Sequence, residues 1–254
     1  MIYFIGAGPG APDLITVRGA ELLRRAGMIV YAGSLVNPAL LDCAPEGCEI
    51  HDSASLTLDE VMDLLLDGCR RGLLTVRLHT GDPSLYGAIR EQMDRLRAAG
   101  VPFEVVPGVS SFCAAAAALP AEYTLPGVSQ TVIISRMEGR TPVPERESVR
   151  SLAAHGASMV LFLSAGMLES LCAELIAGGF PQETPAALVY RASWPEERVL
   201  RGTLADLPSQ AREAGITRQA LVLVGNFLGD DYALSKLYDA KFSHGYRKSR
   251  EEIK

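Results

Sequence analysis

Residues 1–13 read MIYFIGAGPGAPD, and the apolar run Ile2–Ile5 leads directly into the glycine-rich turn Gly6–Gly10. A short apolar run that ends at glycines is typical of a buried strand followed by a turn. Apolar residues then recur at helical spacing from Val17 to Ala26, and a second apolar run covers Met28–Tyr31. A strand, a glycine-rich turn, a helix and a second strand predict the beginning of an α/β fold.

The same alternation continues through the first half of the chain. We expect three further helices and two further strands there; the helices are Leu58–Cys69, Ser84–Ala99 and Ser111–Leu119, and the strands are Leu73–Leu78 and Val101–Val106. Strands that alternate with helices at this spacing indicate a mostly parallel sheet covered by helices.

Prolines and glycines cluster between residues 121 and 149 and interrupt this rhythm. We therefore predict two domains, an N-terminal α/β domain at 1–120 that carries the glycine-rich turns and a C-terminal α/β domain at 121–254 with a basic tail. We expect its sheet to be mixed. Its strands are expected at Thr131–Ser135, Met159–Leu163, Ala186–Tyr190, Arg198–Thr203 and Ala220–Val224, with helices at Leu168–Ala177 and Leu204–Ala214. The charged strand Arg198–Thr203 is predicted to lie at an edge.

Composition narrows the class of protein. The net charge of −6 and the lack of a dense basic block before residue 240 argue against nucleic acid as a partner. Runs such as Met159–Leu163 are too short to span a membrane, and no basic segment precedes the first apolar run, so we expect a cytoplasmic protein without a membrane partner. The five cysteines are an odd number without a Cys-x-x-Cys pair, and Cys43, Cys48 and His51 lack a fourth ligand, so no metal site is expected.

Three glycine-bearing turns follow predicted strands of the first domain. They are Gly6–Asp13, His79–Pro83 and Pro107–Ser111. Open α/β sheets bind ligands at the carboxyl ends of their strands, so three such turns on one edge would surround a ligand. Asp82 either caps the following helix or meets a ligand, and Ser110 and Ser111 have the same two interpretations.

The first turn also matches Gly-x-Gly-x-x-Gly/Ala, which would favour an NAD-dependent oxidoreductase as the alternative. Pro9 and Pro12 remove amide donors that a pyrophosphate needs. No acidic residue occurs in 28–36, where the ribose-binding acid of a dinucleotide fold is expected. Both observations argue against a dinucleotide.

Taken together and in this order, the three turns resemble the tetrapyrrole methylase family, over about residues 1–229. Further stretches resemble one branch of that family, which methylates the C-11 ring carbon of a corrin precursor; these are Tyr31–Pro38, His51–Ala54, Leu78–Gly87 and Glu122–Pro142. The alternatives within the family are methylases of uroporphyrinogen or of precorrin-2/3. The uroporphyrinogen methylases carry an Asp after the second strand, where this chain has Ala32-Gly33-Ser34.

The resemblance implies an S-adenosylmethionine-dependent C-methyltransferase of cobalamin biosynthesis. It implies a homodimer of two-domain chains, a cofactor cleft between the domains and S-adenosylhomocysteine as product. The implied cofactor-binding residues are Pro9, Gly81, Asp82, Leu85, Ser110 and Ser111 from the first domain and Leu163, Ala192 and Ala220 from the second. Plain strand packing is the alternative for Leu163 and Ala220, and no catalytic acid or base is assigned.

The tetrapyrrole substrate has carboxylates around its rim and needs cations despite the acidic chain. Arg136 and Arg140, in the loop after Thr131–Ser135, are the first candidates, because guanidinium groups pair well with carboxylates. Glu138 and His79 are further substrate-binding candidates that could move a proton. Weaker cationic candidates are Arg18, Arg77 and Arg191.

Overall fold

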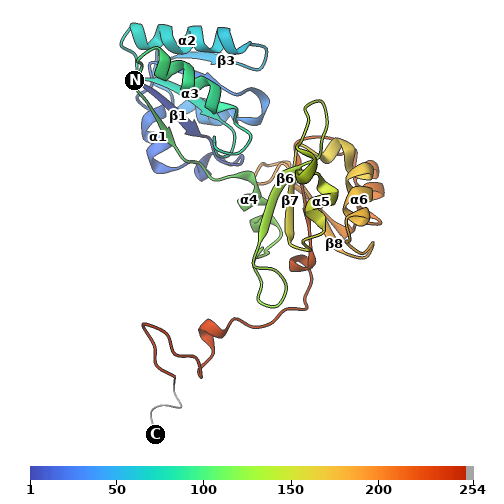
Figure 1. Ribbon diagram of the computed structural model, residues 1–254. Coiled ribbons are helices and arrows are strands. Elements are labelled where there is room, and N and C mark those ends of the chain that lie inside the picture. The colour runs from blue at the N-terminus through green and yellow to red at the C-terminus, as the bar shows by residue number, and fades with distance from the viewer. Residues whose placement is uncertain (250–254) are drawn as a thin grey trace. The chain divides into compact units, whose positions relative to one another are not determined.

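The computed structural model describes residues 1–249, Ser34 by its backbone alone. The chain divides into two compact units (Figure 1). The first comprises Met1–Ala118 and Tyr190–Arg198, and the second comprises Leu119–Val189 and the chain from Val199 onward. One boundary at residue 120 cannot describe this division, because the segment Tyr190–Arg198 packs with the first unit although its neighbours in sequence belong to the second.

The first unit is built on a five-stranded sheet in the order β3-β2-β4-β1-β5. Every pairing in it is parallel. The strands are β1 (Ile2–Gly6), β2 (Met28–Tyr31), β3 (Glu49–Asp52), β4 (Thr75–His79) and β5 (Phe103–Val106). The predicted parallel sheet is confirmed. Strand β3 was not predicted, because its residues Glu-Ile-His-Asp are mostly polar.

Helices cover both faces of this sheet. On one face, Phe4 and Val30 pack against α2 (Leu58–Arg70) and α3 (Ile89–Ala98). On the other face, Ile5 and Ile29 pack against α1 (Val17–Leu23). Because successive residues of a strand point to opposite faces, the apolar runs of β1 and β2 fill both layers of core.

Two helix predictions of the first unit need correction. The helix predicted at Ser84–Ala99 begins only at Ile89, because Tyr86 (φ 57°) and Ala88 (φ 49°) adopt left-handed backbone conformations that end any helical run. The helix predicted from Val17 ends at Leu23 rather than at Ala26, since the chain turns towards β2. The unit's last helix is α4 (Ser111–Ala118).

The second unit contains a five-stranded sheet in the order β6-β7-β10-β8-β9. It is mixed as predicted, because β6 (Val132–Arg136) runs parallel to β7 (Ser158–Phe162) while β10 (Ala220–Val224) runs antiparallel to β7. The remaining strands are β8 (Pro185–Tyr190) and β9 (Arg198–Thr203), and β9 lies at the predicted edge.

Three helices accompany this sheet: α5 (Val149–Ala153), α6 (Leu168–Ala177) and α7 (Leu207–Glu213). Helix α7 is shorter than the predicted 204–214, because the side chain of Asp206 accepts the backbone N–H of Thr203 and holds residues 203–206 in a turn. Within residues 1–249, none of the helices is both long and apolar enough to cross a lipid bilayer.

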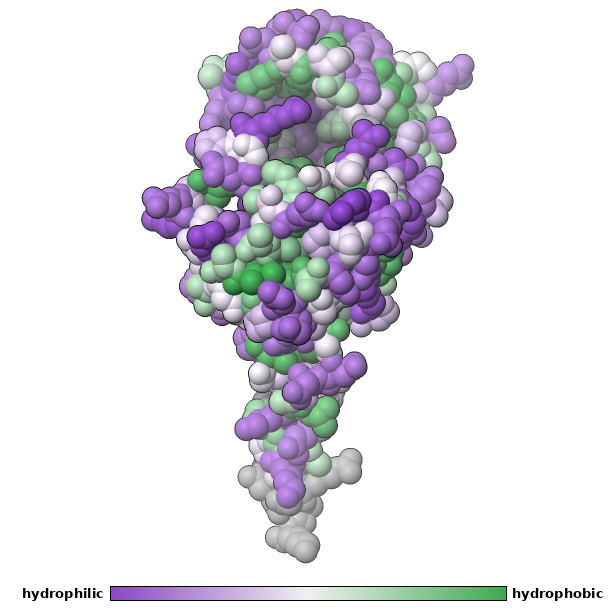
Figure 2. Space-filling view, turned by 90° about the vertical axis from the view of Figure 1, so that its right-hand side faces the viewer, coloured by the Kyte–Doolittle hydropathy of each residue, from purple (hydrophilic) through white to green (hydrophobic). Residues whose placement is uncertain are grey.

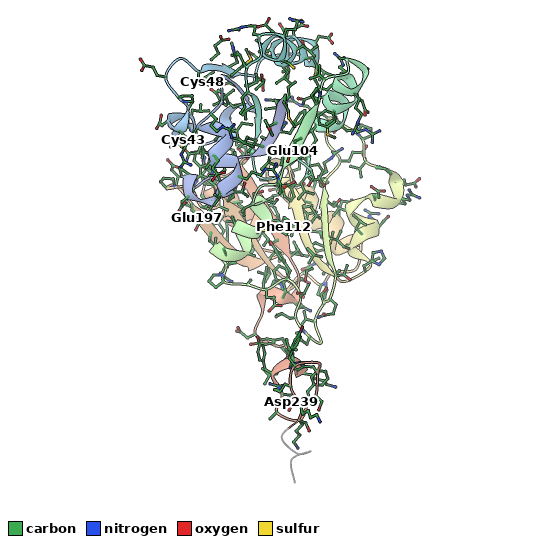
Figure 3. The ribbon with its side chains drawn as sticks, turned by 90° about the vertical axis from the view of Figure 1, so that its left-hand side faces the viewer. Cys43, Cys48, Glu104, Phe112, Glu197 and Asp239 are labelled. Atoms are coloured by element: carbon green, nitrogen blue, oxygen red, sulfur yellow. The ribbon has the colours of Figure 1, made fainter. Side chains whose placement is uncertain are left out.

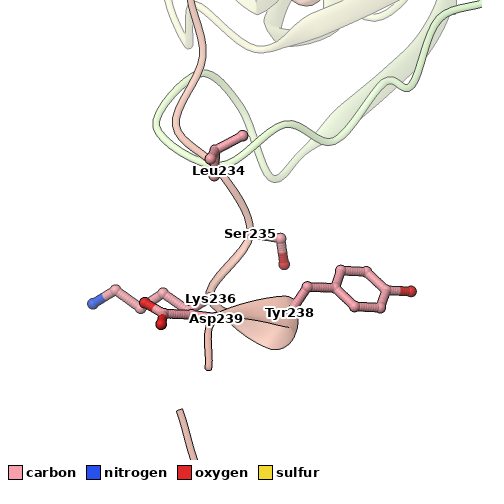
Figure 4. A pocket seen from close by; sticks show the side chains of 5 residues that line it. All are labelled: Leu234, Ser235, Lys236, Tyr238 and Asp239. Carbon is pink, nitrogen blue, oxygen red and sulfur yellow. The ribbon is translucent and has the colours of Figure 1, made fainter. Parts of the chain in front are cut away.

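The chain after Gly229 contains one short 3-10 helix, Lys236–Tyr238, among the described residues. Its large apolar side chains are exposed, and Figure 2 shows hydrophobic and hydrophilic surface side by side where the chain leads to the grey residues. A shallow pocket there is lined only by residues between 234 and 239 (Figure 4). Because one short stretch supplies the whole lining, this pocket is not a site assembled from converging elements. The predicted basic tail includes Arg250, which lies outside the described residues.

Candidate cofactor and substrate site

The three glycine-bearing turns follow strands that are direct neighbours. Strands β4, β1 and β5 lie side by side and run parallel. Their carboxyl ends therefore meet at one edge of the first sheet, and each carries one of the turns. The prediction that the three turns share an edge is confirmed, and this edge is where open α/β sheets hold their ligands.

Backbone contacts join these turns to one another. Gly8 and Gly81 form an antiparallel bridge, in which Gly81 N–H donates to Gly8 O at 2.8 Å and Gly8 N–H donates to Gly81 O at 3.3 Å. A Cβ atom added to Gly6 would lie 2.5 Å from Gly108 Cα and 2.6 Å from Gly81 O, closer than real Cβ contacts. Glycine is thus required where the turns touch, and the edge presents bare backbone rather than side chains.

The carboxylate of Asp82 connects the second turn to the third. One oxygen, Oδ2, accepts the Gly108 N–H at 2.8 Å, and the other accepts the N–H of Ser84 at 2.8 Å as well as its hydroxyl. Burial alone would raise the pKa of Asp82, but the hydrogen bonds from Ser84 and Gly108 outweigh it and lower the pKa. Asp82 therefore caps a turn rather than a helix, and Oδ2, which accepts only the Gly108 N–H, retains a lone pair for a ligand.

The other implied cofactor residues of the first unit lie at the same edge. Ser110 is buried, and its carbonyl accepts the N–H groups of Cys113 and Ala114, which starts α4 at Ser111. Leu85 is half-buried, and its N–H donates to Asp82 O. The edge thus gathers the following predicted residues: Pro9, Gly81, Asp82, Leu85, Ser110 and Ser111. Its bare backbone, carboxylate and serine hydroxyls fit a ligand with a nucleoside part, which offers a flat base and ribose hydroxyls.

Leu163 and Ala220 lie at adjoining ends of two neighbouring strands of the second unit, β7 and β10. The register pairs Val222 with Leu161, so its continuation by two residues sets Ala220 opposite Leu163. Leu163 follows the end of β7, is 67% exposed and has a left-handed φ of 54°. Leu163 is thus not packed within the sheet, and left-handed backbone in residues other than glycine concentrates at functional positions. Ala192 is buried, within the segment 190–198 of the first unit.

The predicted substrate arginines differ in their surroundings. The guanidinium of Arg136 donates to the carbonyls of Met137, Thr141 and Pro142 at 2.8–3.3 Å, so it shapes the loop that follows β6. Arg140, in the same loop, is exposed, and within residues 1–249 it has no ion-pair partner. Glu138 is exposed on the same loop. The guanidinium of Arg140 is therefore accessible to a ligand, whereas that of Arg136 is hydrogen-bonded to carbonyls of its own loop.

His79 lies in the core of the first unit rather than on its surface. Its side chain is on the face of β4 covered by α2 and α3, and it stacks on Phe4 with ring centroids 6.1 Å apart. It is 4% exposed, and Nε2 has no hydrogen-bond partner among residues 1–249. Burial, assisted by the charge of Arg77, lowers the pKa of His79 to about 3. The imidazole is therefore neutral near pH 7 and is not presented to a substrate from this position.

The weaker cationic candidates all have protein partners. Arg18 pairs with Glu104, which Figure 3 labels. Arg77 is buried, donates to Val30 O at 3.1 Å and to the Gln92 side chain, and has a pKa lowered by burial to about 10. Arg191 pairs with Glu196 at 3.3 Å. The protein itself therefore already engages the guanidinium of each of these three residues.

Sequence reasoning missed the residues that hold the first turn. Trp194 Nε1 donates to Pro9 O at 3.0 Å, and Ser193 Oγ accepts the Ala11 N–H at 3.0 Å. Asn37 Nδ2 donates to Gly10 O at 2.8 Å. One sequence feature could have pointed to this segment: the only tryptophan of the chain lies between two predicted strands and is followed by a proline.

The family model for tetrapyrrole (corrin/porphyrin) methylases matches residues 1–208. The chain belongs to this family. It is 50% identical over 253 residues to the cobalt-precorrin-4 C(11)-methyltransferase of Methanocaldococcus jannaschii, which covers 99% of this chain and 98% of that protein. It is 46% identical to the precorrin-4 C(11)-methyltransferase of Pseudomonas aeruginosa, over 97% of this chain and 98% of that protein.

Solved structures are similar over most of the chain. A cobalt precorrin-4 methyltransferase, described as a cobalamin biosynthetic enzyme, matches with a TM-score of 0.88 and 47% identity over 90% of this chain and 96% of that chain. A uroporphyrin-III C-methyltransferase from Thermus thermophilus, complexed with S-adenosylhomocysteine, matches with a TM-score of 0.73 and 29% identity over 89% of this chain and 98% of that chain.

Proposed function

We propose that this protein transfers a methyl group from S-adenosylmethionine to C-11 of precorrin-4 or cobalt-precorrin-4 in cobalamin biosynthesis. The observation that carries the proposal is the match, over nearly the whole chain, to C(11)-methyltransferases, combined with three glycine-bearing turns at one sheet edge. The uroporphyrinogen alternative is less favoured, because the sequence identity to solved structures of that class is 29–32%, against 47% for the cobalt precorrin-4 enzyme.

We propose that Pro9, Gly81, Asp82, Ser110 and Ser111 bind the cofactor at the edge of the first sheet. Bare glycine backbone permits close approach, and the Asp82 carboxylate can accept a hydrogen bond from ribose or from the ammonium group. Leu85, Ala192, Leu163 and Ala220 complete the proposed set with apolar contacts. S-adenosylmethionine, when bound, supplies an activated methyl group on a sulfonium, which leaves as neutral S-adenosylhomocysteine after transfer.

The chain's contribution to the reaction is chiefly orientation. Bound S-adenosylmethionine would supply the methyl group: the methyl–sulfur bond would break as the bond to the ring carbon forms, and the methylated ring, which gains one positive charge, would then release a proton. Because the leaving group is already activated and the reduced ring is electron-rich, holding the two reactants at van der Waals distance provides most of the acceleration. Buried His79, with its pKa near 3, is not a base for this proton.

We propose that Arg140 pairs with a rim carboxylate of the tetrapyrrole, that Glu138 lies beside it, and that Arg136 keeps their loop in shape. The exposed guanidinium of Arg140, in a loop held by three carbonyl contacts of Arg136, supports this division of roles. A bidentate contact between guanidinium and carboxylate gives both affinity and orientation.

We also propose a cytoplasmic homodimer, as the family resemblance implies. All five cysteines are free thiols, as expected for a reducing compartment. Sedimentation velocity of the purified chain tests the dimer, and a sedimenting species of one chain mass at micromolar concentration would contradict it.

Calorimetric titration with S-adenosylhomocysteine, with NAD as the parallel ligand, tests the cofactor. Mass spectrometry after incubation with S-adenosylmethionine and either cobalt-precorrin-4 or uroporphyrinogen III tests the substrate. We expect saturable binding of S-adenosylhomocysteine, no binding of NAD, and one added methyl group on cobalt-precorrin-4 alone. Methylation of uroporphyrinogen III in its place would overturn the proposed substrate.

A further inference from the structure

The segment Tyr190–Arg198, which connects β8 to β9, packs on the glycine-rich turn at the start of the chain. The Trp194 indole lies so close to Gly10 that a Cβ atom on Gly10 would overlap it. Its Nε1–H donates to Pro9 O at 3.0 Å. Trp194 therefore both fills the space beside Gly10 and binds the preceding carbonyl.

Three successive residues of the turn have polar groups bound by side chains. Besides the Pro9 carbonyl, the Gly10 carbonyl accepts the side-chain amide of Asn37 at 2.8 Å, and the Ala11 N–H donates to Ser193 Oγ at 3.0 Å. These groups lie beyond the last ladder contact of β1, so no sheet hydrogen bond fixes them. The side chains replace the sheet as the support of this turn.

The segment that carries Trp194 is itself held in an uncommon conformation. Arg191 and Ser193 have left-handed φ angles of 46° and 68°. The carboxylate of Glu197, labelled in Figure 3, accepts the Ser193 N–H at 2.6 Å, and the guanidinium of Arg191 lies 5.2 Å from the Trp194 ring. Left-handed backbone in residues other than glycine persists only where the surroundings impose it, and such sites concentrate at functional positions.

We propose that Trp194 and Ser193 are positioning residues for the cofactor: they hold the Pro9–Ala11 turn in the shape that binds S-adenosylmethionine, without a role in the chemical step. This inference rests on the proposed function of the turn. A turn held in its bound shape loses less conformational freedom when the ligand arrives, so its support appears as ligand affinity.

The test uses Trp194→Phe, which keeps a smaller aromatic ring at this position and removes the N–H that binds Pro9 O. Ser193→Ala is the second variant and removes the acceptor for Ala11. We expect each to raise the Kd for S-adenosylhomocysteine by about fivefold to tenfold in calorimetry, the effect of one lost hydrogen bond. The KM for S-adenosylmethionine should rise similarly, while kcat and the KM for the tetrapyrrole stay within twofold.

Phe180→Leu is the matched control, because Phe180 is a buried aromatic residue of the second unit, whereas the turn belongs to the first. It should lower thermal stability without changing the Kd. If the wild-type chain binds S-adenosylhomocysteine but both variants bind it as tightly as the wild type, the positioning role is wrong. If the wild-type chain does not bind it, the proposed function fails first. A fall in kcat alone would instead place Trp194 in the chemical step and overturn the inference.

Discussion

Replacing Asp82 by Ala tests whether this carboxylate ties two of the turns together. The change removes the acceptor for Gly108 N–H and two contacts of Ser84. The Gly108 contact is partly buried, and an orphaned donor there costs about 1–3 kcal/mol. The two contacts of exposed Ser84 add about 0.5 kcal/mol each. We therefore expect Asp82→Ala to lower the free energy of unfolding by about 2–4 kcal/mol and to weaken cofactor binding as well.

Urea denaturation followed by tryptophan emission is the suitable assay. Trp194 is the only tryptophan in the chain and packs within the first unit, so its emission follows the unit that contains Asp82. Asp13→Ala is the matched control, because Asp13 is exposed and forms no side-chain cap; we expect a change within about 0.5 kcal/mol. Equal stability of the Asp82→Ala and Asp13→Ala variants would refute the reasoning.

The pH dependence of the same variant provides an independent check. The pKa of Asp82 is lower in the folded chain than in the unfolded one, so its contribution is present at neutral pH and is lost as the pH falls through the folded value. We expect the wild-type chain to lose stability more steeply than Asp82→Ala below about pH 4. Parallel profiles would mean that the carboxylate has no preferential interaction in the folded state.

Three further predictions concern the loop after β6 and the buried histidine. Arg140→Ala should raise the KM for the tetrapyrrole about tenfold and leave the Kd for S-adenosylhomocysteine unchanged; Arg146→Ala, an exposed neighbour, is its control, and an equal effect of both would remove Arg140 from the site. Arg136→Ala should lower the free energy of unfolding of the second unit by about 1–3 kcal/mol, because three carbonyls of the loop lose their donor. An unchanged melting temperature in scanning calorimetry would contradict this. His79→Phe should flatten the loss of stability between pH 6.5 and about pH 3, since the wild-type imidazole takes up a proton only on unfolding in that range; a fall as steep as that of the wild type would show that other groups cause it.

Much of the fold was predictable because hydrophobic periodicity is local. The strand predicted at Met28–Tyr31 and the helix predicted at Leu168–Ala177 have the same first and last residues in the structure. The helix at Ser84 was wrong because the sequence gives no sign of the left-handed backbone at Tyr86 and Ala88. Strand β3 was missed because a short edge strand with mostly polar residues lacks the apolar pattern that identifies buried strands.

The candidate site was predictable where glycines mark close backbone approach, as at Gly6 and Gly108, or a left-handed φ, as at Gly81. It was not predictable where partners come from distant parts of the sequence. Trp194 and Pro9 are 185 residues apart, and neither local pattern nor spacing connects them. In the sequence, Arg136 and Arg140 are two arginines of one loop and cannot be told apart. Only the structure shows that Arg136 binds carbonyls of the loop while Arg140 is exposed.

The most direct test of the central claim is the position of the transferred methyl group. The purified chain is incubated with cobalt-precorrin-4 and S-adenosylmethionine labelled with ¹³C in its methyl group, and the product is analysed by NMR. The account predicts a single labelled methyl on C-11, formed in step with S-adenosylhomocysteine. A label on another ring carbon, or no label in the product while a well-folded chain binds the cofactor, would contradict it.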